Sequence, residues 1–305
     1  MKSSIVVLAA LSFAAAHAGA PARPPITSVS HVSFYSADMA KSDAFYTHDL
    51  GAAKRDDPEN KDGVRYYFNS RQWVEVLPLP AGPTSVNRMD HAAFNTADVA
   101  AMRKFLVANK IKAFAINKGA DGSRWFYVND PEGNRIEFVQ LPKQLLDIPD
   151  NPLSNHIIHF GMIVHSEAAM DPFYRTLLGF RPYWFGGPKG KPAAWISQQV
   201  PDGTDWMEYM IVSGPEKTGI PADMTQSTAG VLNHFALGVA NMEKTVTLLA
   251  DGERISEKSD GPKIGLDGKW QFNMYDPDGT RAEFMEFHAV IKPCCSPFTA
   301  SDPEN

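Results

Sequence analysis

The chain has 305 residues, of which 44% are hydrophobic and 21% are charged, and its formal net charge is −6. This composition is typical of a folded protein with enough chain for about two domains. No run of Lys and Arg stands out, which excludes the basic surface expected of a nucleic-acid-binding protein.

The N-terminus has the pattern of a signal peptide. Lys2 precedes an apolar stretch, Ile5 to Ala16, which is too short to span a bilayer. Ala16-His17-Ala18 then provides a small-x-small cleavage motif. We predict that residues 1–18 are a signal peptide and that the mature protein is exported, to the periplasm or outside the cell. A buried strand and a retained anchor are the alternatives for this stretch.

The rest of the chain consists of two halves that repeat in order. Residues 45–51 read FYTHDLG and residues 173–179 read FYRTLLG. Residues 129–138 read NDPEGNRIEF, and residues 275–284 read YDPDGTRAEF. Self-similarity at a fixed offset indicates duplicated structural units.

Each half divides again into two modules. Four β-like segments carry a histidine among apolar residues: Ser28 to Tyr35, Arg88 to Phe94, Ile157 to Val164 and Leu232 to Val239. A stretch with helical apolar spacing follows each: Asp38 to Leu50, Ala97 to Asn109, Glu167 to Leu178 and Met242 to Ala250. Further strand-like segments complete each module, and the last one contains a glutamate. The predicted order is β-α-β-β-β, four times.

The predicted modules span residues 27–80, 87–141, 155–213 and 231–290. They make two domains, residues 27–141 and 155–290, joined by a Pro-rich linker at residues 142–154. An irregular tail at residues 291–305 contains the only two cysteines, Cys294 and Cys295. We predict that these cysteines are peripheral to function, with a vicinal disulfide or an intermolecular link as alternatives.

Each module pairs a first-strand histidine with a last-strand glutamate. The pairs are His31 with Glu75, His91 with Glu137, His159 with Glu208, and His234 with Glu283. Imidazole and carboxylate together suit Zn, Fe, Ni or Mn. An ionised glutamate in an apolar strand is costly unless it is paired or bound to a cation. We therefore predict that all eight residues are metal ligands, with two modules supplying two His and two Glu to each site. A duplicated protein can also keep one such site in a purely structural role.

These motifs resemble the vicinal oxygen chelate superfamily, which includes glyoxalase I, bleomycin- and fosfomycin-resistance proteins and extradiol dioxygenases. The resemblance rests on FYxxxLG after a first-strand histidine and on DPxGxRxEF, which ends in the ligand glutamate, and it covers residues 27–141 and 155–290. It implies an α+β fold in which each half is a cupped, open barrel of mixed β-sheet with flanking helices around one divalent metal ion. The modules would pair either within a half or across a homodimer.

The resemblance also implies a choice between reactions. In glyoxalase I-like chemistry a ligand carboxylate shuttles a proton, and Glu137 or Glu283 would be that catalytic group. The extradiol signature places a Tyr three residues before the Asp of the D-P pair; Tyr127 fits in module two, but Asn273 stands there in module four.

We expect a metal-dependent enzyme that acts on a small vicinal-oxygen substrate, with isomerase or lyase chemistry favoured slightly over Fe(II)-dependent ring cleavage because of the four-ligand sets. A non-catalytic binding protein of the bleomycin-resistance type is the third reading. We expect no nucleic-acid partner, and no membrane partner once the signal peptide is removed.

Overall fold

The computed structural model of the chain describes residues 21–81, 88–214, 217, 232–256 and 258–304. The predicted signal peptide, residues 1–18, lies outside these ranges. Within them, no helix is both long enough and apolar enough to cross a membrane.

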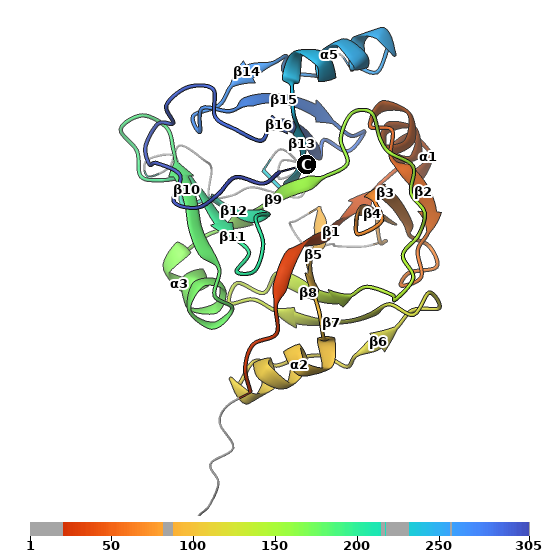
Figure 1. Cartoon of the computed structure of the whole chain (residues 1–305), viewed down its shortest axis with the longest axis vertical. Helices are drawn as coiled ribbons and strands as arrows, with labels where there is room; N and C mark the ends of the chain where they lie inside the picture. The colour runs from red at the N-terminus through yellow and green to blue at the C-terminus, as the bar shows by residue number, and fades with distance from the viewer. Residues whose placement is uncertain (1–20, 82–87, 215–216, 218–231, 257, 305) are drawn as a thin grey trace, which may run out of the picture.

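The first half of the chain forms one curled, eight-stranded sheet in the order β2-β3-β4-β1-β5-β8-β7-β6 (Figure 1). Its strands are β1 (Ile26–Ser36), β2 (Ala53–Asp56), β3 (Val64–Asn69), β4 (Gln72–Pro78), β5 (Met89–Thr96), β6 (Asn117–Lys118), β7 (Arg124–Asn129) and β8 (Arg135–Gln140). The antiparallel pairing of β1 with β5 joins module one to module two. The two modules therefore pair within one half of one chain.

The second half repeats this sheet in the order β10-β11-β12-β9-β13-β16-β15-β14. Its strands are β9 (Ile157–Val164), β10 (Arg181–Gly186), β11 (Trp195–Gln199), β12 (Trp206–Ile211), β13 (His234–Val239), β14 (Lys263–Ile264), β15 (Trp270–Tyr275) and β16 (Arg281–Glu286). Each module thus has the predicted β-α-β-β-β order, and the α+β fold of two cupped sheets is confirmed.

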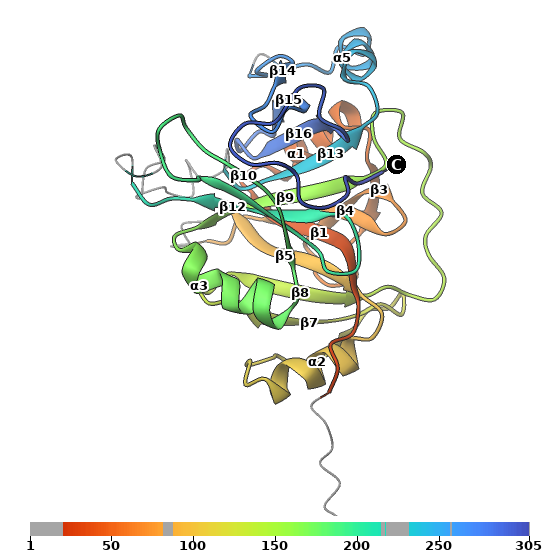
Figure 2. The ribbon, with the colours of Figure 1, turned by 60° about the vertical axis from the view of Figure 1, so that its left-hand side comes forward.

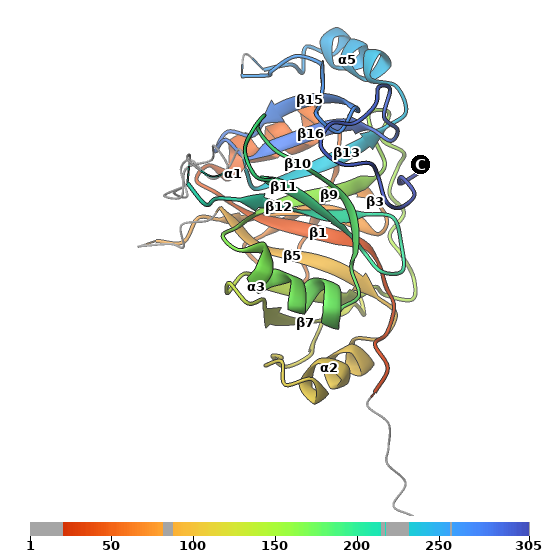
Figure 3. The ribbon, with the colours of Figure 1, turned by 90° about the vertical axis from the view of Figure 1, so that its left-hand side faces the viewer.

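One helical segment follows the first strand of each module. The α-helices are α1 (Met39–Ala44), α2 (Val99–Ala108), α3 (Glu167–Asp171) and α5 (Met242–Asp251). An N-cap side chain, from Asp38, Asp98, Ser166 or Asn241, accepts a hydrogen bond from a first-turn amide in each. Figures 2 and 3 show α2 and α5 at opposite ends of the molecule.

In modules one and three the helix continues as a π-helical turn, η1 (Phe45–Asp49) and η2 (Pro172–Leu177). Sequence periodicity predicted a single regular helix here. Both π-helical turns contain the repeated Phe-Tyr motif, and both end before a glycine with positive φ, Gly51 and Gly179, as the sequence predicted.

The repeated motifs meet across the two halves. The hydroxyl of Tyr46 donates to Asp276 at 3.3 Å, and the hydroxyl of Tyr174 donates to Asp130 at 3.1 Å. Module one therefore contacts module four, and module three contacts module two. Each aspartate also accepts two backbone N–H groups of its own D-P-x-G turn, which holds its carboxylate in place.

A shared core lies between the two sheets. Because strand residues alternate between faces, Phe34 points away from the face that carries Ser33. Its ring lies 6.2 Å from Phe235 of the second half, and Phe94 lies 5.7 Å from Phe160. The two sheets thus pack against each other through these aromatic rings, and the concave face of each sheet remains available to form a site.

The C-terminal tail packs on the second half although it forms no helix or strand in the described residues. Lys269 Nζ, fully buried, donates to Asp302 at 2.9 Å and to the carbonyl of Phe287 at 2.6 Å. The indole N–H of Trp184 donates to the carbonyl of Cys294, and Cys294 and Cys295 form a vicinal disulfide. The tail is therefore part of the folded domain.

Candidate metal centres

The four candidate ligands of the first half meet at one buried point on the concave face of its sheet. They come from the four central strands: His31 from β1, Glu75 from β4, His91 from β5 and Glu137 from β8. The Nε2 atoms of His31 and His91 are 2.9 Å apart. Glu137 Oε2 lies 3.1 Å from His91 Nε2 and 3.5 Å from His31 Nε2, and Glu75 Oε2 lies 3.8 Å from His91 Nε2.

The second half brings its four candidates together in the same way. His159 and His234 have their Nε2 atoms 3.1 Å apart. Glu283 Oε2 lies 3.6 Å from each of them, and Glu208 Oε2 lies 3.7 Å from His234 Nε2. All eight residues predicted from the repeats therefore fall into two clusters of four.

The donor atoms have the spacing and chemistry that a cation requires. Two nitrogens, each about 2.1 Å from an ion and at a right angle, lie about 3 Å apart; the two Nε2–Nε2 distances match this value. In the first cluster, Oε1 of Glu137 and Oε2 of Glu75 are buried without a hydrogen-bond partner among the described residues. A buried carboxylate without partners is costly unless a cation joins it, so the first cluster fits a divalent metal ion. The second cluster fits one through the same donor types at similar distances.

The carboxylates of the two clusters have the same pattern of pKa shifts, although the pKa of His91 is raised and that of its counterpart His234 is lowered. Burial, and after it the negative charge of Glu283, raises the pKa of Glu208 to about 8. Burial would also raise the pKa of Glu283, but the charge of Arg281 and the contact with His159 outweigh it and hold this pKa at about 2. In the first half, burial raises the pKa of Glu75 to about 8, whereas the two histidines outweigh burial and hold that of Glu137 at about 2. In each cluster one glutamate, Glu75 or Glu208, therefore ionises readily at neutral pH only if a cation binds beside it.

Neighbouring groups fix the orientation of the histidine rings. Nδ1 of His91 lies 2.8 Å from Asp90, and Nδ1 of His234 lies 2.6 Å from the carbonyl of Leu232. A partner on Nδ1 leaves Nε2 free to face the cluster, as in metal-binding histidines generally. His31 stacks on Trp73 and His159 stacks on Trp206, each with ring centres 4.5 Å apart.

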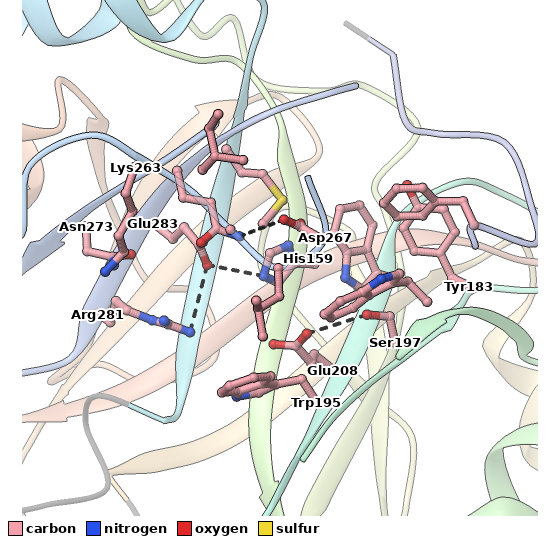
Figure 4. Close-up of a pocket in the computed structure, with 18 residues that line it drawn as sticks. His159, Tyr183, Trp195, Ser197, Glu208, Lys263, Asp267, Asn273, Arg281 and Glu283 are labelled. Carbon is pink, nitrogen blue, oxygen red and sulfur yellow. Dashed lines mark hydrogen bonds and ion pairs between the residues drawn. The ribbon is translucent and has the colours of Figure 1, made fainter. Parts of the chain in front are cut away.

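A cavity of about 350 Å³ opens onto the second cluster (Figure 4). Its lining includes His159, Glu208 and Glu283, together with Arg281. Its aromatic wall consists of Tyr183, Trp184, Trp195, Trp206 and Phe298, the last of which belongs to the C-terminal tail. A small molecule in this cavity would contact the ligand residues directly.

The cavity beside the first cluster, of about 400 Å³, is more polar than the second. It is lined by Glu75 and His91 but by neither His31 nor Glu137. Trp73, the counterpart of Trp206, is also outside its lining. The two centres therefore share their donors but differ in access.

The other histidines and acidic residues near the motifs lie outside the clusters. His156 contacts Asp205 at the boundary between the halves, and His165 contacts Glu132 across it. His288 pairs with Asp302 of the tail.

Two neighbours of the first centre went unrecognised in the sequence. Asp90 stands immediately before His91, and an acidic residue beside a ligand histidine is a signal that could have identified it. Glu59 gives no such signal, because it lies in the loop between β2 and β3, far in sequence from any ligand residue.

Comparisons with known proteins agree with this geometry. Residues 28–138 match the family model described as the Glyoxalase/Bleomycin resistance protein/Dioxygenase superfamily. A comparison with curated protein sequences gives no match. The first domain therefore belongs to the vicinal oxygen chelate superfamily, as its motifs predicted, and the second domain has the same fold.

Solved structures with a similar fold include two 2,3-dioxygenases. The 2,3-dioxygenase LapB from Pseudomonas sp. KL28 is 14% identical, with a TM-score of 0.63 over 90% of this chain and 97% of that one. A variant of homoprotocatechuate 2,3-dioxygenase from B. fuscum, in complex with HPCA, is 18% identical, with a TM-score of 0.64 over 88% of this chain and 72% of that one. At these identities the likeness shows the two-domain fold alone.

Proposed function

We propose that the chain is a divalent-metal-dependent enzyme that acts on a small molecule with vicinal oxygen atoms, and that the reaction takes place in the second domain. The observation that carries this proposal is the cavity of about 350 Å³ whose lining includes His159, Glu208 and Glu283 together. A pocket that reaches imidazole and carboxylate donors is where a substrate and a metal ion can meet. This cavity reaches three of the four donors and has an aromatic wall, whereas the first cavity reaches two, His91 and Glu75.

His159, His234 and Glu283 would hold the ion, since Glu283 Oε2 lies 3.6 Å from the Nε2 atom of each histidine. Glu208 also lies close enough to both histidines to share an ion with them, and would be a fourth ligand that can leave it. Zn, Ni, Fe and Mn all suit this set. When bound, the ion would supply a Lewis acid that stabilises negative charge on a substrate oxygen. Arg281, at 3.8 Å from Glu283, adds a second positive charge to the same wall of the cavity.

We propose Glu208 as the group that moves a proton, a role that the family resemblance gave to Glu137 or Glu283. Glu283 is held by two histidines and an arginine, whereas the Glu208 carboxylate faces the cavity and has Ser197 Oγ at 3.5 Å. It would take a proton from the carbon that bears a hydroxyl group and return it to the neighbouring carbonyl carbon, while the hydroxyl proton passes to the carbonyl oxygen. Such an isomerisation needs no oxidant, because the proton is returned and no electrons leave the substrate.

Ring cleavage by a dioxygenase is the second candidate. The aromatic wall of the cavity, with Trp195 and Trp206, suits a flat ring, and similar solved structures carry that activity in their names. The fourth donor, Glu208, and Asn273 in place of a tyrosine favour proton transfer instead. Binding without turnover is the third candidate.

The test compares three variants of the metal-loaded protein. Glu208→Gln is expected to retain the metal while slowing the exchange of the α-proton of hydroxycarbonyl compounds into D₂O, followed by NMR, by roughly 10²- to 10⁴-fold. Glu283→Gln is expected to lose the second-domain metal. Glu243→Gln, an exposed change on α5, serves as the control.

The outcomes separate the three candidates. Proton exchange that depends on Glu208 supports the proposal. Oxygen uptake with catechols, unaffected by Glu208→Gln, would replace it with the dioxygenase. Neither reaction, with a ligand bound tightly in the cavity, would point to a binding protein.

We also propose export, on the basis of residues 1–18 alone. Sequencing the N-terminus of the mature protein should give Gly19 as its first residue. A mature chain that still begins at Met1 would contradict it.

A further inference from the structure

The two centres differ in the residue that precedes their second ligand histidine. Asp90 stands before His91 in the first domain, and Asn233 stands before His234 in the second. The two positions are counterparts, because each histidine lies on the strand that pairs with the first strand of its half. A carboxylate in the first domain is therefore replaced by a neutral amide in the second.

Asp90 holds the ligand histidine of the first centre through a charged hydrogen bond. The Nδ1–H group of His91 donates to Asp90 at 2.8 Å, and the hydroxyl of Tyr35 donates to the same carboxylate. The Asp90 side chain is 10% exposed, so water screens its charge only weakly. A carboxylate on the far nitrogen of a ligand histidine fixes the ring and makes the nitrogen that faces the metal more basic.

The groups at these places in the second domain are neutral. The Nδ1–H group of His234 donates to the carbonyl of Leu232 at 2.6 Å. Oδ1 of Asn233 accepts the backbone N–H of Ile163 at 3.0 Å. A carbonyl oxygen also fixes the histidine ring, but it brings no full negative charge. His234 is therefore the less basic ligand of the two.

Asp90 also pairs with the arginine of the last strand of the first domain. Arg135 is the register partner of His91, and its Nη1 lies 3.0 Å from Asp90. Its guanidinium carbon lies 5.1 Å from the ring centre of Tyr127, and its side chain is 48% exposed. The charge of this arginine is thus balanced by a carboxylate and screened by water.

The corresponding arginine of the second domain lies beside a ligand. Arg281 is the register partner of His234, and its Nη2 lies 3.8 Å from Oε2 of Glu283 (Figure 4). Its side chain is only 17% exposed. Asn233 and Arg281 together carry one positive charge, whereas their counterparts in the first domain carry no net charge. A positive charge this close to a ligand carboxylate repels the cation that the carboxylate would bind.

The cation that lies over the tryptophan of each centre does not offset this difference. The guanidinium carbon of Arg65 lies 4.4 Å from the ring centre of Trp73, and Lys269 Nζ lies 5.3 Å from that of Trp206. Arg65 is paired with two carboxylates and Lys269 with one. The charges around the tryptophans therefore do not favour metal binding in the second domain over the first.

We propose that the first centre binds a divalent metal ion more tightly than the second, and that Asp90 sets this difference through its contacts with His91 and Arg135. Asp90 is a positioning residue, because it acts on the ion through a ligand. The inference rests on the metal binding that the proposed function also requires, and it is independent of the reaction proposed for the second domain.

The experiment measures the dissociation constant of Zn²⁺ in full-length chains that keep one centre each. His159→Ala with Glu283→Ala leaves the first centre, and His31→Ala with Glu137→Ala leaves the second. Each chain is titrated with Zn²⁺ in competition with a chelating dye. Because a group that orients a ligand typically changes metal affinity by about 10- to 100-fold, we expect the first centre to bind Zn²⁺ about tenfold or more tightly than the second.

Asp90→Asn, made in the chain that keeps the first centre, is expected to weaken Zn²⁺ binding by about 10- to 100-fold. Asn233→Asp, made in the chain that keeps the second centre, is expected to tighten it, and this variant tests the same position if Asp90→Asn does not fold. Asp56→Asn is the matched control, because Asp56 is exposed on β2 and its replacement removes one negative charge from the same domain. It is expected to leave the dissociation constant unchanged.

Arg281→Gln distinguishes an effect of charge from a loss of structure. Removing the cation beside Glu283 should tighten Zn²⁺ binding by the second centre, because the repulsion of the ion is removed. A residue that only supported the fold would give weaker binding when it is replaced.

Equal Zn²⁺ affinities in the two single-centre chains, or tighter binding by the second, would overturn the proposal. So would an Asp90→Asn chain that folds and binds Zn²⁺ as tightly as its parent, or an intact first centre that takes up no Zn²⁺. The proposed function fails separately, when the second centre binds metal and the chain shows no turnover.

Discussion

A single methyl group at Gly161 should remove the second metal centre. Gly161 on β9 is the register partner of His234, and a Cβ at this position would lie 2.1 Å from Cε1 of that histidine and 2.5 Å from its Nδ1. Non-bonded carbon atoms prefer a separation of about 3.5 Å or more. The ring would therefore have to retreat by about 1.4 Å, whereas a metal–ligand bond tolerates a deviation of about 0.2 Å.

The first domain provides the matched control for this change. Ser33 occupies the counterpart position, opposite His91, and therefore already carries a Cβ. Ser33→Ala keeps that atom and should leave the first centre intact.

The assay is the metal content of the purified protein together with its chemical denaturation. Gly161→Ala is expected to reduce two equivalents of metal to one, and to lower the free energy of unfolding by about 1–3 kcal/mol through overpacking. Combined with Glu137→Ala, it should leave none. A Gly161→Ala protein that retains both equivalents would refute the assignment of His234 as a ligand.

Two further predictions concern stability. Asp302→Ala leaves Lys269 buried without its carboxylate partner. Because Asp302 is partly exposed, we expect the free energy of unfolding, measured by chemical denaturation, to fall by about 2–4 kcal/mol, somewhat less than for a fully buried pair. A decrease well below 1 kcal/mol would show that this contact does not hold the tail. Burial raises the pKa of Asp276 from 3.8 to about 6, so its folded form binds the proton more tightly and the resulting stability, present below pH 4, is lost as the pH rises through 6. The unfolding free energy of Asp276→Asn, relative to that of the wild type, should therefore increase by about 3 kcal/mol from pH 4 to pH 7. A difference between the two proteins that does not change with pH would contradict this.

Much of the fold could be predicted because repeated local patterns determine it. The alternation of apolar residues around His31 and its three counterparts identified the first strand of every module, and the interval to each glutamate identified the last. Whether the modules pair within a half or across a homodimer could not be predicted, because both arrangements bring two histidines and two glutamates together. The strand order of the two sheets shows pairing within each half.

The contacts between the halves could not be predicted in the same way. The repeated tyrosine Tyr46 reads as a core residue, and its partner Asp276 lies 230 positions away in the other domain. Local periodicity reports which residues are buried and not which distant element buries them. The π-helical turn that carries this tyrosine could not be predicted either, because the 3.6-residue periodicity of apolar residues indicates an α-helix.

The surroundings of the first centre were also hidden in the sequence. Arg65 stands in a strand where an arginine is usually exposed, and only the positions of Asp57 and Glu59 bury it. Both halves have two histidines and two glutamates as candidate ligands, so a prediction from the ligands alone treats the two centres as equivalent. Export and a possible homodimer remain predictions.

The central claim is that both clusters bind a divalent metal ion, and the metal content of the full-length protein purified without added ions tests it most directly. We predict two equivalents of Zn, Ni, Fe or Mn per chain, with one lost on His91→Ala and the other on His234→Ala. A folded protein that contains close to no metal, and takes up none on addition of these ions, would contradict the account.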